Sequence, residues 1–464
     1  TPHIDNLARK GIVFTNAHAS ASVCTPSRYG FLTGRYAWRS KSAARGGNGF
    51  SKSIIEEERV TIANLFKNAG YSTACIGKWH LGLNWQTKEK SEEVTFFPDS
   101  GLSNVDYTKK VEKGPDSYGF DYSFIHPASL DMPPYVFLRD NLVIDPEIVL
   151  TSEIYPSNLN ATEYSWDRKH TNENDVYWEK MVWWRRGEIS KSFRIENCLT
   201  EIVEDGVSYI EKHAENNSST PFFMYMPLTG PHTPWIPTDM FKEKSSIGTY
   251  GDFILNIDHV VGQITETLIK NGLYENTIII FSSDNGAYWP KSEIELNQHD
   301  SHMGRRGQKG DIWDGGHRIP LIISWPTGIN RKGHYEHLVS LTDLFATISD
   351  LTNQKLKDNN GEDSFSFFHV LNGDLNTKTR HSMVHQSSGG RFGLRMEEWK
   401  YIEGLGSGGF TDPRVMEPKP GGPTGQLYHT KNDLSESTNL FLKHPKIVDK
   451  LQNELDKQKS GSSN

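Results

Sequence analysis

Hydrophobic residues along the chain recur in two alternating patterns. Apolar side chains at helical spacing over residues 253–268, ending near Gly272, predict a long amphipathic helix. A short, wholly apolar run at 277–281 follows it and predicts a buried strand. The same order, a helix and then a strand, is predicted at 1–10 with 12–14, at 61–70 with 71–76, and at 201–213 with 222–226. This alternation is typical of an α/β fold with a large, mainly parallel or mixed sheet between helices, which binds ligands at the carboxyl ends of its strands.

The pattern changes twice along the chain. Between about 84 and 200 the periodicity weakens, and we interpret this region as an insertion. After about residue 375, short strand-like runs and glycine-rich turns lead to a final amphipathic helix. We therefore predict a catalytic α/β domain over 1–375 and a smaller C-terminal α+β subdomain, with a small antiparallel sheet and a terminal helix, over 376–464.

The composition of the chain disfavours several classes of function. Lys plus Arg number 50 against 58 for Asp plus Glu, a formal net charge of −8, so no basic excess favours a nucleic-acid partner. The longest apolar runs, such as 277–281 and 320–325, are far shorter than the roughly 20 residues of a membrane-spanning helix. Three cysteines are too few for a disulfide framework in a chain of 464 residues. Any special cysteine is therefore expected to have a chemical role.

Ionisable residues concentrate in five short segments beside glycine or proline. Each segment follows a predicted strand or lies in a loop: Cys24-Thr25-Pro26-Ser27-Arg28, Gly77-Lys78-Trp79-His80, Gly230-Pro231-His232-Thr233-Pro234, Ser282-Ser283-Asp284-Asn285-Gly286 and Arg306-Gly307-Gln308-Lys309-Gly310. Taken singly, each is more often structural than functional, because Asp-Asn-Gly is common in turns and a lysine between glycines is usually solvated. A doubly wound sheet could bring all five segments to one edge, so we interpret them together as one candidate site.

The residue types indicate what chemistry these segments could support. Cys24 precedes a proline that fixes the turn and Arg28 that could hold an anion, so a cysteine nucleophile is one interpretation. Lys78 and His80 are two residues apart and point the same way if the chain is extended, which places a cation binder beside a proton carrier. Asp284 and the asparagine after it offer oxygen atoms to a hard cation.

The segment Cys24-Thr25-Pro26-Ser27-Arg28, with Thr33-Gly34-Arg35 behind it, resembles the signature of the formylglycine-dependent sulfatases, the type I sulfatases of the alkaline phosphatase superfamily. The other four segments resemble family elements in the same order. So do Gly119-Phe120-Asp121, Trp399-Lys400-Tyr401 and Leu427-Tyr428, and the resemblance covers nearly the whole chain. It implies the family's α/β fold with a C-terminal subdomain and the hydrolysis of sulfate esters.

The resemblance also implies roles for individual residues. Cys24 corresponds to the cysteine that a formylglycine-generating or anaerobic maturation enzyme oxidises to formylglycine. Ca²⁺, with Mg²⁺ as the alternative, is the implied metal, held by Asp284, Asn285 and the modified Cys24. The residues implied to bind sulfate or move protons are Arg28, Lys78, His80, His232 and Lys309. Among these, His232 or Lys309 is expected to protonate the leaving oxygen, and His80 to assist the release of sulfate.

The sequence departs from the family pattern in three places. Family members begin with a strand that ends in an Asp-Asp pair, which supplies two more metal ligands, and no adjacent Asp-Asp pair occurs in the 464 residues. We expect the chain to be a fragment of a complete enzyme rather than a natural protein with an incomplete metal site. Asp314 stands where the family usually has Glu, and His317 precedes Arg318. These two changes are expected to alter the substrate pocket and not the class of reaction.

Three functions stay open at this point. The favoured one is a periplasmic or secreted sulfatase acting on a sulfated carbohydrate or polysaccharide. A formylglycine-dependent phosphodiesterase or phosphonate monoester hydrolase is the alternative enzyme, because relatives with the same signature cleave phosphorus esters. The alternative from another class is a metal-deficient pseudo-sulfatase that only binds sulfated glycans. Neither nucleic acid nor a membrane span is expected with any of them.

Overall fold

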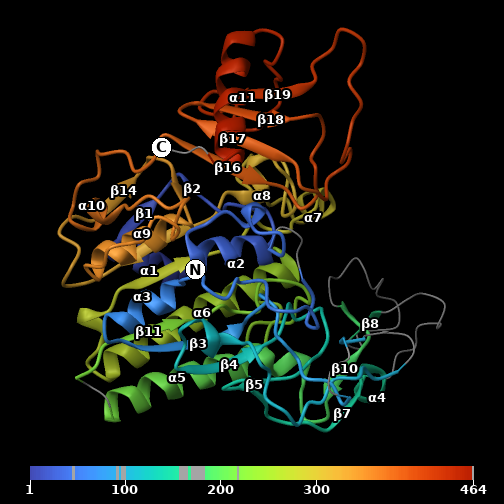
Figure 1. The fold of residues 1–464 in the computed structure, drawn as a ribbon, viewed down its shortest axis with the longest axis vertical. Helices are drawn as coiled ribbons and strands as arrows, with labels where there is room; N and C mark the ends of the chain where they lie inside the picture. Colours follow the sequence, from blue (N-terminus) through green and yellow to red (C-terminus); the bar gives the residue numbers. More distant parts are fainter. Residues whose placement is uncertain are drawn as a thin grey trace. The chain divides into compact units, whose positions relative to one another are not determined.

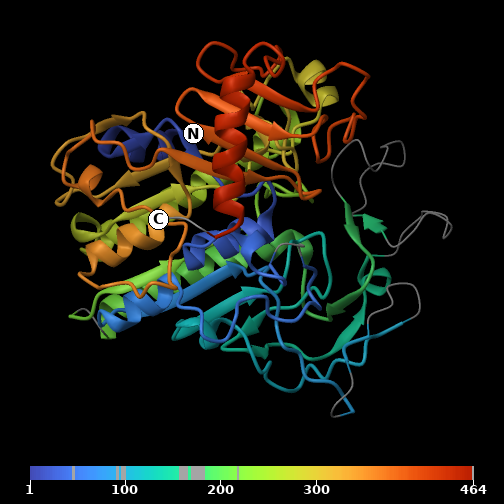
Figure 2. The same ribbon diagram turned by 45° about the horizontal axis from the view of Figure 1, so that its top comes forward.

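The computed structural model describes residues 1–43, 47–89, 93–95, 101–155, 166–168, 183–216 and 219–461. The chain forms two compact units, each with helices packed on a sheet (Figures 1 and 2). Unit 1 contains Thr1–Asn6 and Gly47–Glu275, and unit 2 contains Leu7–Gly46 and Asn276–Asn464. This division does not coincide with the predicted boundary after residue 375, which stays a prediction. Part of the predicted insertion at 84–200 lies outside the described residues.

The sheet of unit 1 is centred on β3 (Ser72–Lys78). β3 pairs in parallel with β11 (Phe222–Tyr225) on one side and with β4 (Tyr122–His126) on the other. Two short antiparallel strands, β5 (Leu138–Arg139) and β6 (Leu142–Val143), extend the sheet beyond β4. The three parallel strands therefore end at the same edge.

Helices cover both faces of this sheet. On one face, Ala74 and Ile76 of β3 pack with Ile202 of α5 (Cys198–Asn216) in a buried apolar cluster. On the other face, Phe66 of α3 (Ile62–Asn68) stacks on Phe223 of β11 at 4.3 Å between ring centroids. Because successive strand residues point to opposite faces, the unbroken apolar run of β3 is buried on both sides.

Further elements of unit 1 surround this core. The long helix α6 (Gly248–Lys270) buries Phe253, Ile257 and Val260 and contacts α5. The remaining helices and strands of the unit are β7 (Ile148–Leu150), α4 (Thr151–Ile154), β8 (Trp166–Arg168), β9 (Trp183–Arg185) and β10 (Glu188–Ser190), with the 3₁₀ turns Pro115–Tyr118 and Ile195–Asn197. The 3₁₀ turn Tyr274–Asn276 includes the last two residues of the unit.

Unit 2 contains a second mixed sheet, in the order β12 (Ile279–Ser282), β13 (Leu321–Ser324), β1 (Ile12–Phe14) and β14 (Gly333–Tyr335). β13 is antiparallel to both of its neighbours, and β1 is parallel to β14. Helix α2 (Cys24–Thr33) and helix α9 (Asp343–Leu351) contact each other in this unit. Its other short elements are β2 (Ala17–His18), the 3₁₀ turn Ala37–Arg39, α7 (Lys291–Asn297), α8 (Asp314–His317), β15 (Val339–Ser340) and α10 (Phe368–Leu371), while α1 (Pro2–Lys10) crosses the boundary between the units.

The C-terminal part of unit 2 is an antiparallel meander with a helix packed on it (Figure 1). Its strands are β16 (Ser382–Gln386), β17 (Phe392–Met396), β18 (Trp399–Glu403) and β19 (Gly425–His429). Leu451 and Leu455 of α11 (Pro445–Lys459) pack on Leu394 and Leu427 of this sheet.

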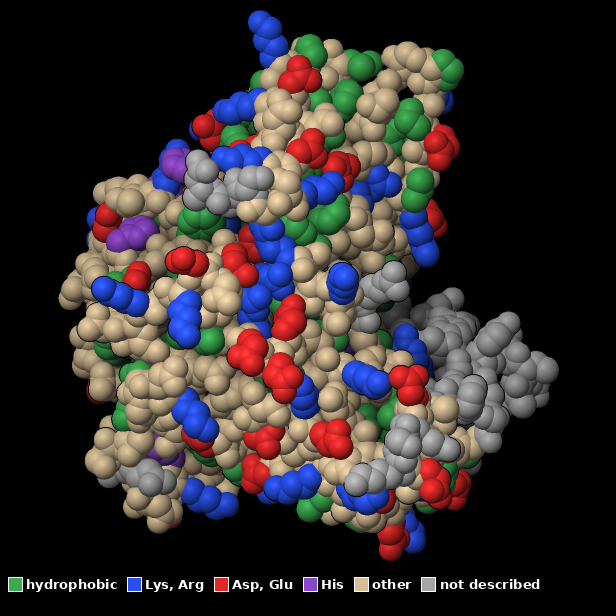
Figure 3. Space-filling view, in the orientation of Figure 1, with side chains coloured by type: hydrophobic (Ala, Val, Ile, Leu, Met, Phe, Trp, Pro, Cys, Tyr) green, Lys and Arg blue, Asp and Glu red, His purple; other side chains and the backbone are tan. Residues whose placement is uncertain are grey.

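The structure confirms the α/β class. Its larger sheets are one mixed sheet in each unit and the antiparallel C-terminal sheet of unit 2, and the described residues form three two-stranded sheets besides. Among the described residues, no helix is both long and apolar enough to cross a bilayer. On the face drawn in Figure 3, acidic and basic side chains are interspersed.

Candidate active site

The carboxyl edge of the unit 1 sheet gathers three of the sequence-predicted residues. Lys78, the last residue of β3, is in register with His126, the last residue of β4. The Lys78 amide donates to the Pro227 carbonyl at 2.7 Å, so the chain that follows β11 leaves the sheet beside Lys78 and leads into the loop of His232. Lys78 is 2% exposed, which makes it a buried cation at this edge.

Gly77 explains how the chain beyond β11 comes so close to the end of β3. Its φ of +131° is unfavourable for side chains, and a Cβ there would lie 2.1 Å from the Pro227 carbonyl oxygen. Only glycine permits this contact, which sets the position of Lys78 relative to the residues after β11.

His80 does not continue the strand as the sequence interpretation assumed. It has a φ of +55°, in the left-handed region, because its amide turns to the Pro127 carbonyl at 3.0 Å. Its Nε2 lies 2.9 Å from the Gly47 carbonyl oxygen. His80 is therefore aimed by a turn after β3 and not by the strand alternation that was expected to align it with Lys78.

His232 lies in a loop with two cis peptide bonds, Gly230-Pro231 and Thr233-Pro234. Its ring contacts residues of the loop after β4, with Nε2 3.3 Å from the Ser129 hydroxyl and Nδ1 3.8 Å from a carboxylate oxygen of Asp131. The sequence interpretation missed Asp131, because it lies ten residues after Asp121 and carries no motif of its own. The only signal was an acidic residue just before Pro133 and Pro134.

His126 was also missed, and it differs from His232 in its exposure. It is fully buried, and burial lowers its pKa to about 4, with the charges of His80 and Lys78 acting in the same direction. Its ring nitrogens lie 3.3 Å from the carbonyl oxygens of Val136 and Ser129. A neutral, buried ring of this kind stabilises the loop that carries Ser129 and Asp131.

Unit 2 gathers the other five predicted residues around the start of α2. Cys24 is the first residue of α2 and is 5% exposed. Arg28, one turn later on the same side of the helix, donates from Nε to Asp284 Oδ2 at 2.8 Å. Because the amino end of a helix carries partial positive charge, Cys24 lies where negative charge is stabilised.

Asp284 and Asn285 follow β12 in a tight turn. The Asn285 Nδ2 donates to the Gly286 carbonyl at 2.8 Å, while its Oδ1 is buried with no hydrogen-bond partner among the described residues. A buried amide oxygen without a partner is unfavourable unless a donor or a cation meets it. Amide and carboxylate oxygens are the ligands that Ca²⁺ and Mg²⁺ prefer, so these two residues fit the metal that the sequence implied.

Backbone hydrogen bonds hold the Lys309 segment beside the same turn. The Lys309 amide donates to the Ala287 carbonyl and the Gly310 amide to the Ser22 carbonyl, each at 2.8 Å. Gly286 is packed so tightly that a Cβ would lie 1.9 Å from the Gly315 carbonyl oxygen. Unit 2 thus brings together the segments of Cys24, Asp284 and Lys309, while unit 1 separately brings together Lys78, His80 and His232.

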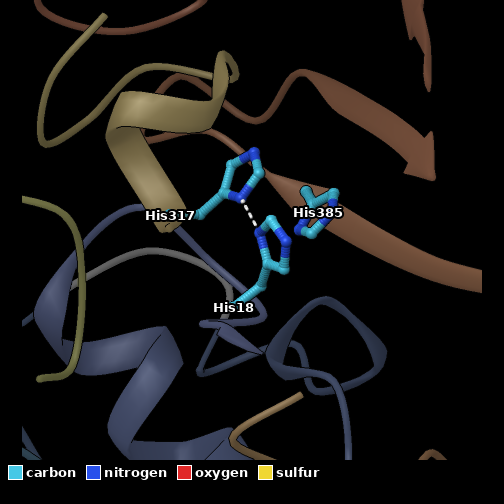
Figure 4. Close-up of side chains that lie close together, drawn as sticks. All are labelled: His18, His317 and His385. Carbon is cyan, nitrogen blue, oxygen red and sulfur yellow. Dashed lines mark hydrogen bonds between the residues drawn. The ribbon is translucent and has the colours of Figure 1, made fainter. Parts of the chain in front are cut away.

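A different group of histidines lies inside unit 2, where His18 of β2, His317 of α8 and His385 of β16 meet (Figure 4). All three are 0% exposed. The Nδ1 atoms of His18 and His317 are 3.0 Å apart, and the His317 and His385 rings stack at 3.8 Å with only 13° between their planes. Neither ring nitrogen of His385 has a hydrogen-bond partner among the described residues.

Charged side chains surround this histidine cluster. Asp314 accepts from Arg395 and from Lys400, each at 2.8 Å, and Lys400 also pairs with Glu436 at 2.8 Å. Burial acts to raise the pKa of Asp314, but Arg395 and Lys400 hold it well below its usual value. Burial lowers the pKa of all three histidines, and Arg395 or Lys400 lowers it further.

The three rings are therefore neutral, and their ligand atoms lie within 4.8 Å of one another, as a metal site would require. Two features argue against a cation there. Parallel stacked rings direct their in-plane lone pairs side by side and not to one point, and Arg395 and Lys400 place positive charge next to the cluster. We assign these histidines, with Asp314, a structural role that joins β2, α8 and the C-terminal sheet.

Comparison with known proteins shows the family. The sulfatase family model matches residues 1–354. An N-acetylgalactosamine-6-O-sulfatase of Bacteroides thetaiotaomicron is 33% identical over 475 residues, covering 99% of this chain and 88% of the relative. Human steryl-sulfatase is 28% identical and covers 83% of this chain and 67% of its own length. The chain belongs to the sulfatase family and is a sulfuric ester hydrolase.

Solved structures agree with this assignment. A structure from work on glycosaminoglycan metabolism by Bacteroides thetaiotaomicron superposes with a TM-score of 0.81 at 31% identity, covering 99% of this chain and 94% of that one. The PsFucS1 sulfatase from Pseudoalteromonas sp. shares the fold with a TM-score of 0.70 at 21% identity, covering 99% of this chain and 84% of its own.

Proposed function

We propose that this sulfatase removes sulfate monoesters from a sulfated carbohydrate, using formylglycine at residue 24 and a bound Ca²⁺. The observation that carries the proposal is the grouping in unit 2. Cys24 begins α2, Arg28 reaches Asp284 from the same helix, and the buried Oδ1 of Asn285 lacks a protein partner among the described residues.

Two groups that the chain does not encode directly would supply part of the chemistry. Formylglycine, when formed, supplies a hydrated aldehyde with one hydroxyl to attack sulfur and a second that allows sulfate to be expelled. Ca²⁺, when bound to Asp284, Asn285 and residue 24, supplies positive charge against the sulfate oxygens. A separate maturation enzyme that reads the Cys24-Thr25-Pro26-Ser27-Arg28 segment is the partner this proposal requires.

The side chains of the protein would do the remaining work. Arg28 holds Asp284 in place, and Lys78 and Lys309 provide fixed positive charge for the sulfate oxygens, on which charge builds up during the reaction. His232, with Lys309 as the alternative, donates a proton to the leaving sugar oxygen. His80 accepts a proton when sulfate is released.

The substrate class is supported by the relatives described above. One of them is named as an N-acetylgalactosamine-6-O-sulfatase, so a 6-O-sulfated N-acetylgalactosamine oligosaccharide is the first substrate to assay. Because such polymers are met outside the cytoplasm, we also propose a periplasmic or secreted location, which fractionation of the source cells would test.

The deciding experiment compares two ester types on protein co-expressed with a formylglycine-generating enzyme. Sulfate release from the oligosaccharide should exceed hydrolysis of a phosphate diester, and mass spectrometry should find formylglycine at residue 24. Faster diester hydrolysis would favour the phosphodiesterase, and binding without turnover would favour the pseudo-sulfatase. Chelation should remove activity and Ca²⁺ should restore it, while Asn285→Ala should weaken Ca²⁺ binding in calorimetry more than the control change Asn297→Ala, which alters a half-buried asparagine of α7.

A further inference from the structure

The tautomer of His232 is fixed by its own loop. Its Nδ1 lies 2.6 Å from the Thr233 carbonyl oxygen, which can only accept a hydrogen bond, so Nδ1 carries a proton. The opposite nitrogen, Nε2, is then the atom through which the ring gains or loses a proton. Nε2 lies 3.3 Å from the Ser129 hydroxyl, and the His232 side chain is 19% exposed, so the ring as a whole is not sealed from solvent.

A buried carboxylate lies behind the ring. Oδ1 of Asp131 is 3.8 Å from Nδ1 of His232, and the Asp131 side chain is only 4% exposed. Its other oxygen, Oδ2, accepts from Arg185 Nη1 at 2.6 Å. The backbones are joined as well, because the Arg185 amide donates to the Asp131 carbonyl at 3.0 Å.

We propose that Asp131, held by Arg185, is a positioning residue for His232 in the transfer of a proton to the leaving group. This inference rests on the function proposed above. The carboxylate and the Thr233 carbonyl both lie on the Nδ1 side, so they favour the orientation in which Nε2 faces away from them. Ser129 then contacts Nε2 from the same loop that carries Asp131.

The charges lead to the same conclusion. Without Asp131, a protonated His232 and Arg185 would be two neighbouring cations that repel each other. The Arg185 side chain is 36% exposed, so water screens its charge only in part. Asp131 lies in contact with the guanidinium and close to the ring, so it offsets this repulsion whenever the ring carries a second proton. Replacing the carboxylate with an amide of the same size removes that effect and leaves the shape of the loop.

The test is Asp131→Asn with Asp205→Asn as its control. Asp205 is also ion-paired in unit 1, to Arg139 at 2.7 Å, but that pair includes no catalytic candidate. Each variant is assayed with a sugar sulfate, a poor leaving group, and with an activated aryl sulfate, which needs little help from an acid. Asp131→Asn should lower kcat on the sugar sulfate by roughly 10- to 100-fold and spare the aryl sulfate, with KM little changed. Asp205→Asn should leave both rates near wild type.

A double variant shows whether Asp131 acts through His232. If it does, His232→Ala with Asp131→Asn is no slower than His232→Ala alone, because the positioning residue has nothing left to position. Additive losses, or equal losses on both substrates in a variant with normal thermal unfolding, would overturn the inference. Failure of the proposed function looks different, since wild-type protein would then release no sulfate from either substrate.

Discussion

The histidines of the two units differ in what surrounds their rings. In unit 1, the His232 side chain is partly exposed, with Nδ1 fixed by a carbonyl oxygen and Nε2 beside the Ser129 hydroxyl. In unit 2, His18, His317 and His385 are fully buried, and their pKa values are lowered first by burial and further by the positive charge of Arg395 and Lys400. We therefore propose that histidine serves as a proton carrier in unit 1 and as a packing element in unit 2, and that exposure with a fixed tautomer separates the two roles.

The largest effect that this comparison predicts concerns cysteine rather than histidine. Cys24→Ala and Cys24→Ser should each reduce sulfate release to background, because neither can present a hydrated aldehyde. Cys198→Ala is the matched control, since Cys198 is a buried thiol in α5 with a pKa raised by burial. Residual turnover by Cys24→Ser above that of a no-enzyme control would contradict the proposed nucleophile.

Replacing one histidine from each group separates the two roles. His232→Ala should lower kcat/KM on a sugar sulfate by roughly 10²–10⁴-fold while unfolding near the wild-type temperature. His385→Ala should instead lower the unfolding temperature by opening a void beside the stacked His317 ring, with kcat preserved below that temperature. Calorimetry and steady-state kinetics on both variants provide the check, and an activity loss in stable His385→Ala would give the unit 2 cluster a catalytic role.

The charged surroundings of the unit 2 cluster should be costly to disturb. Lys400→Met removes the cation between Asp314 and Glu436 and leaves two buried acids without it. We expect the free energy of unfolding to fall by about 3–5 kcal/mol, measured by urea denaturation at pH 7.5. Lys450→Met, which changes an exposed lysine of α11, should cost under about 1 kcal/mol. Comparable losses in the two variants would show that the buried pairing contributes little.

The smallest effect is on the dependence of stability on pH. The pKa of His126 is about 4 in the folded state, below that of an unfolded histidine near 6.5, so the unfolded chain binds more protons between these values. The contribution of neutral His126 to the free energy of unfolding is therefore present above about pH 6.5. It is lost as the pH falls towards 4, and the loss is at most about 3 kcal/mol. Glu436, with a pKa raised to about 7 by burial, acts in the opposite sense. Urea titrations of wild type and His126→Gln at pH 7.5 and 4.5 isolate the histidine, and the variant should lose less stability on acidification.

Much of the fold could be predicted from the hydrophobic pattern. The strand at 12–14 was predicted with its observed bounds, and the helix predicted at 253–268 forms the centre of α6. The apolar run at 277–281 did predict a strand, but not its direction relative to its neighbours. β12 pairs antiparallel with β13, and that pairing depends on a contact between segments far apart in the chain.

For the candidate site as well, local sequence signals could be predicted and contacts between distant segments could not. Residues within recognisable segments, such as Arg28 and Asp284, were named from sequence, and the structure shows that these two are in contact. Asp131, His18 and His385 carry no motif, because their neighbours come from distant parts of the chain, and His317 was noted from the sequence only as the residue that precedes Arg318. The turn at His80 was missed because it depends on the loop after β4, which the local sequence of β3 does not encode.

The backbone contacts around residue 24 have a consequence for the timing of synthesis. Ser22 donates its amide to Gln386 and accepts from Gly310, so the segment leading into α2 gains these partners only when late parts of the chain exist. From residue 24 to residue 386 the ribosome adds 386 − 24 = 362 residues, which takes roughly 20 to 70 s at about 5–20 residues per second. The maturation enzyme proposed above would therefore have to reach the Cys24 thiol, 5% exposed after folding, before these contacts form, and slower elongation over this stretch would lengthen its opportunity.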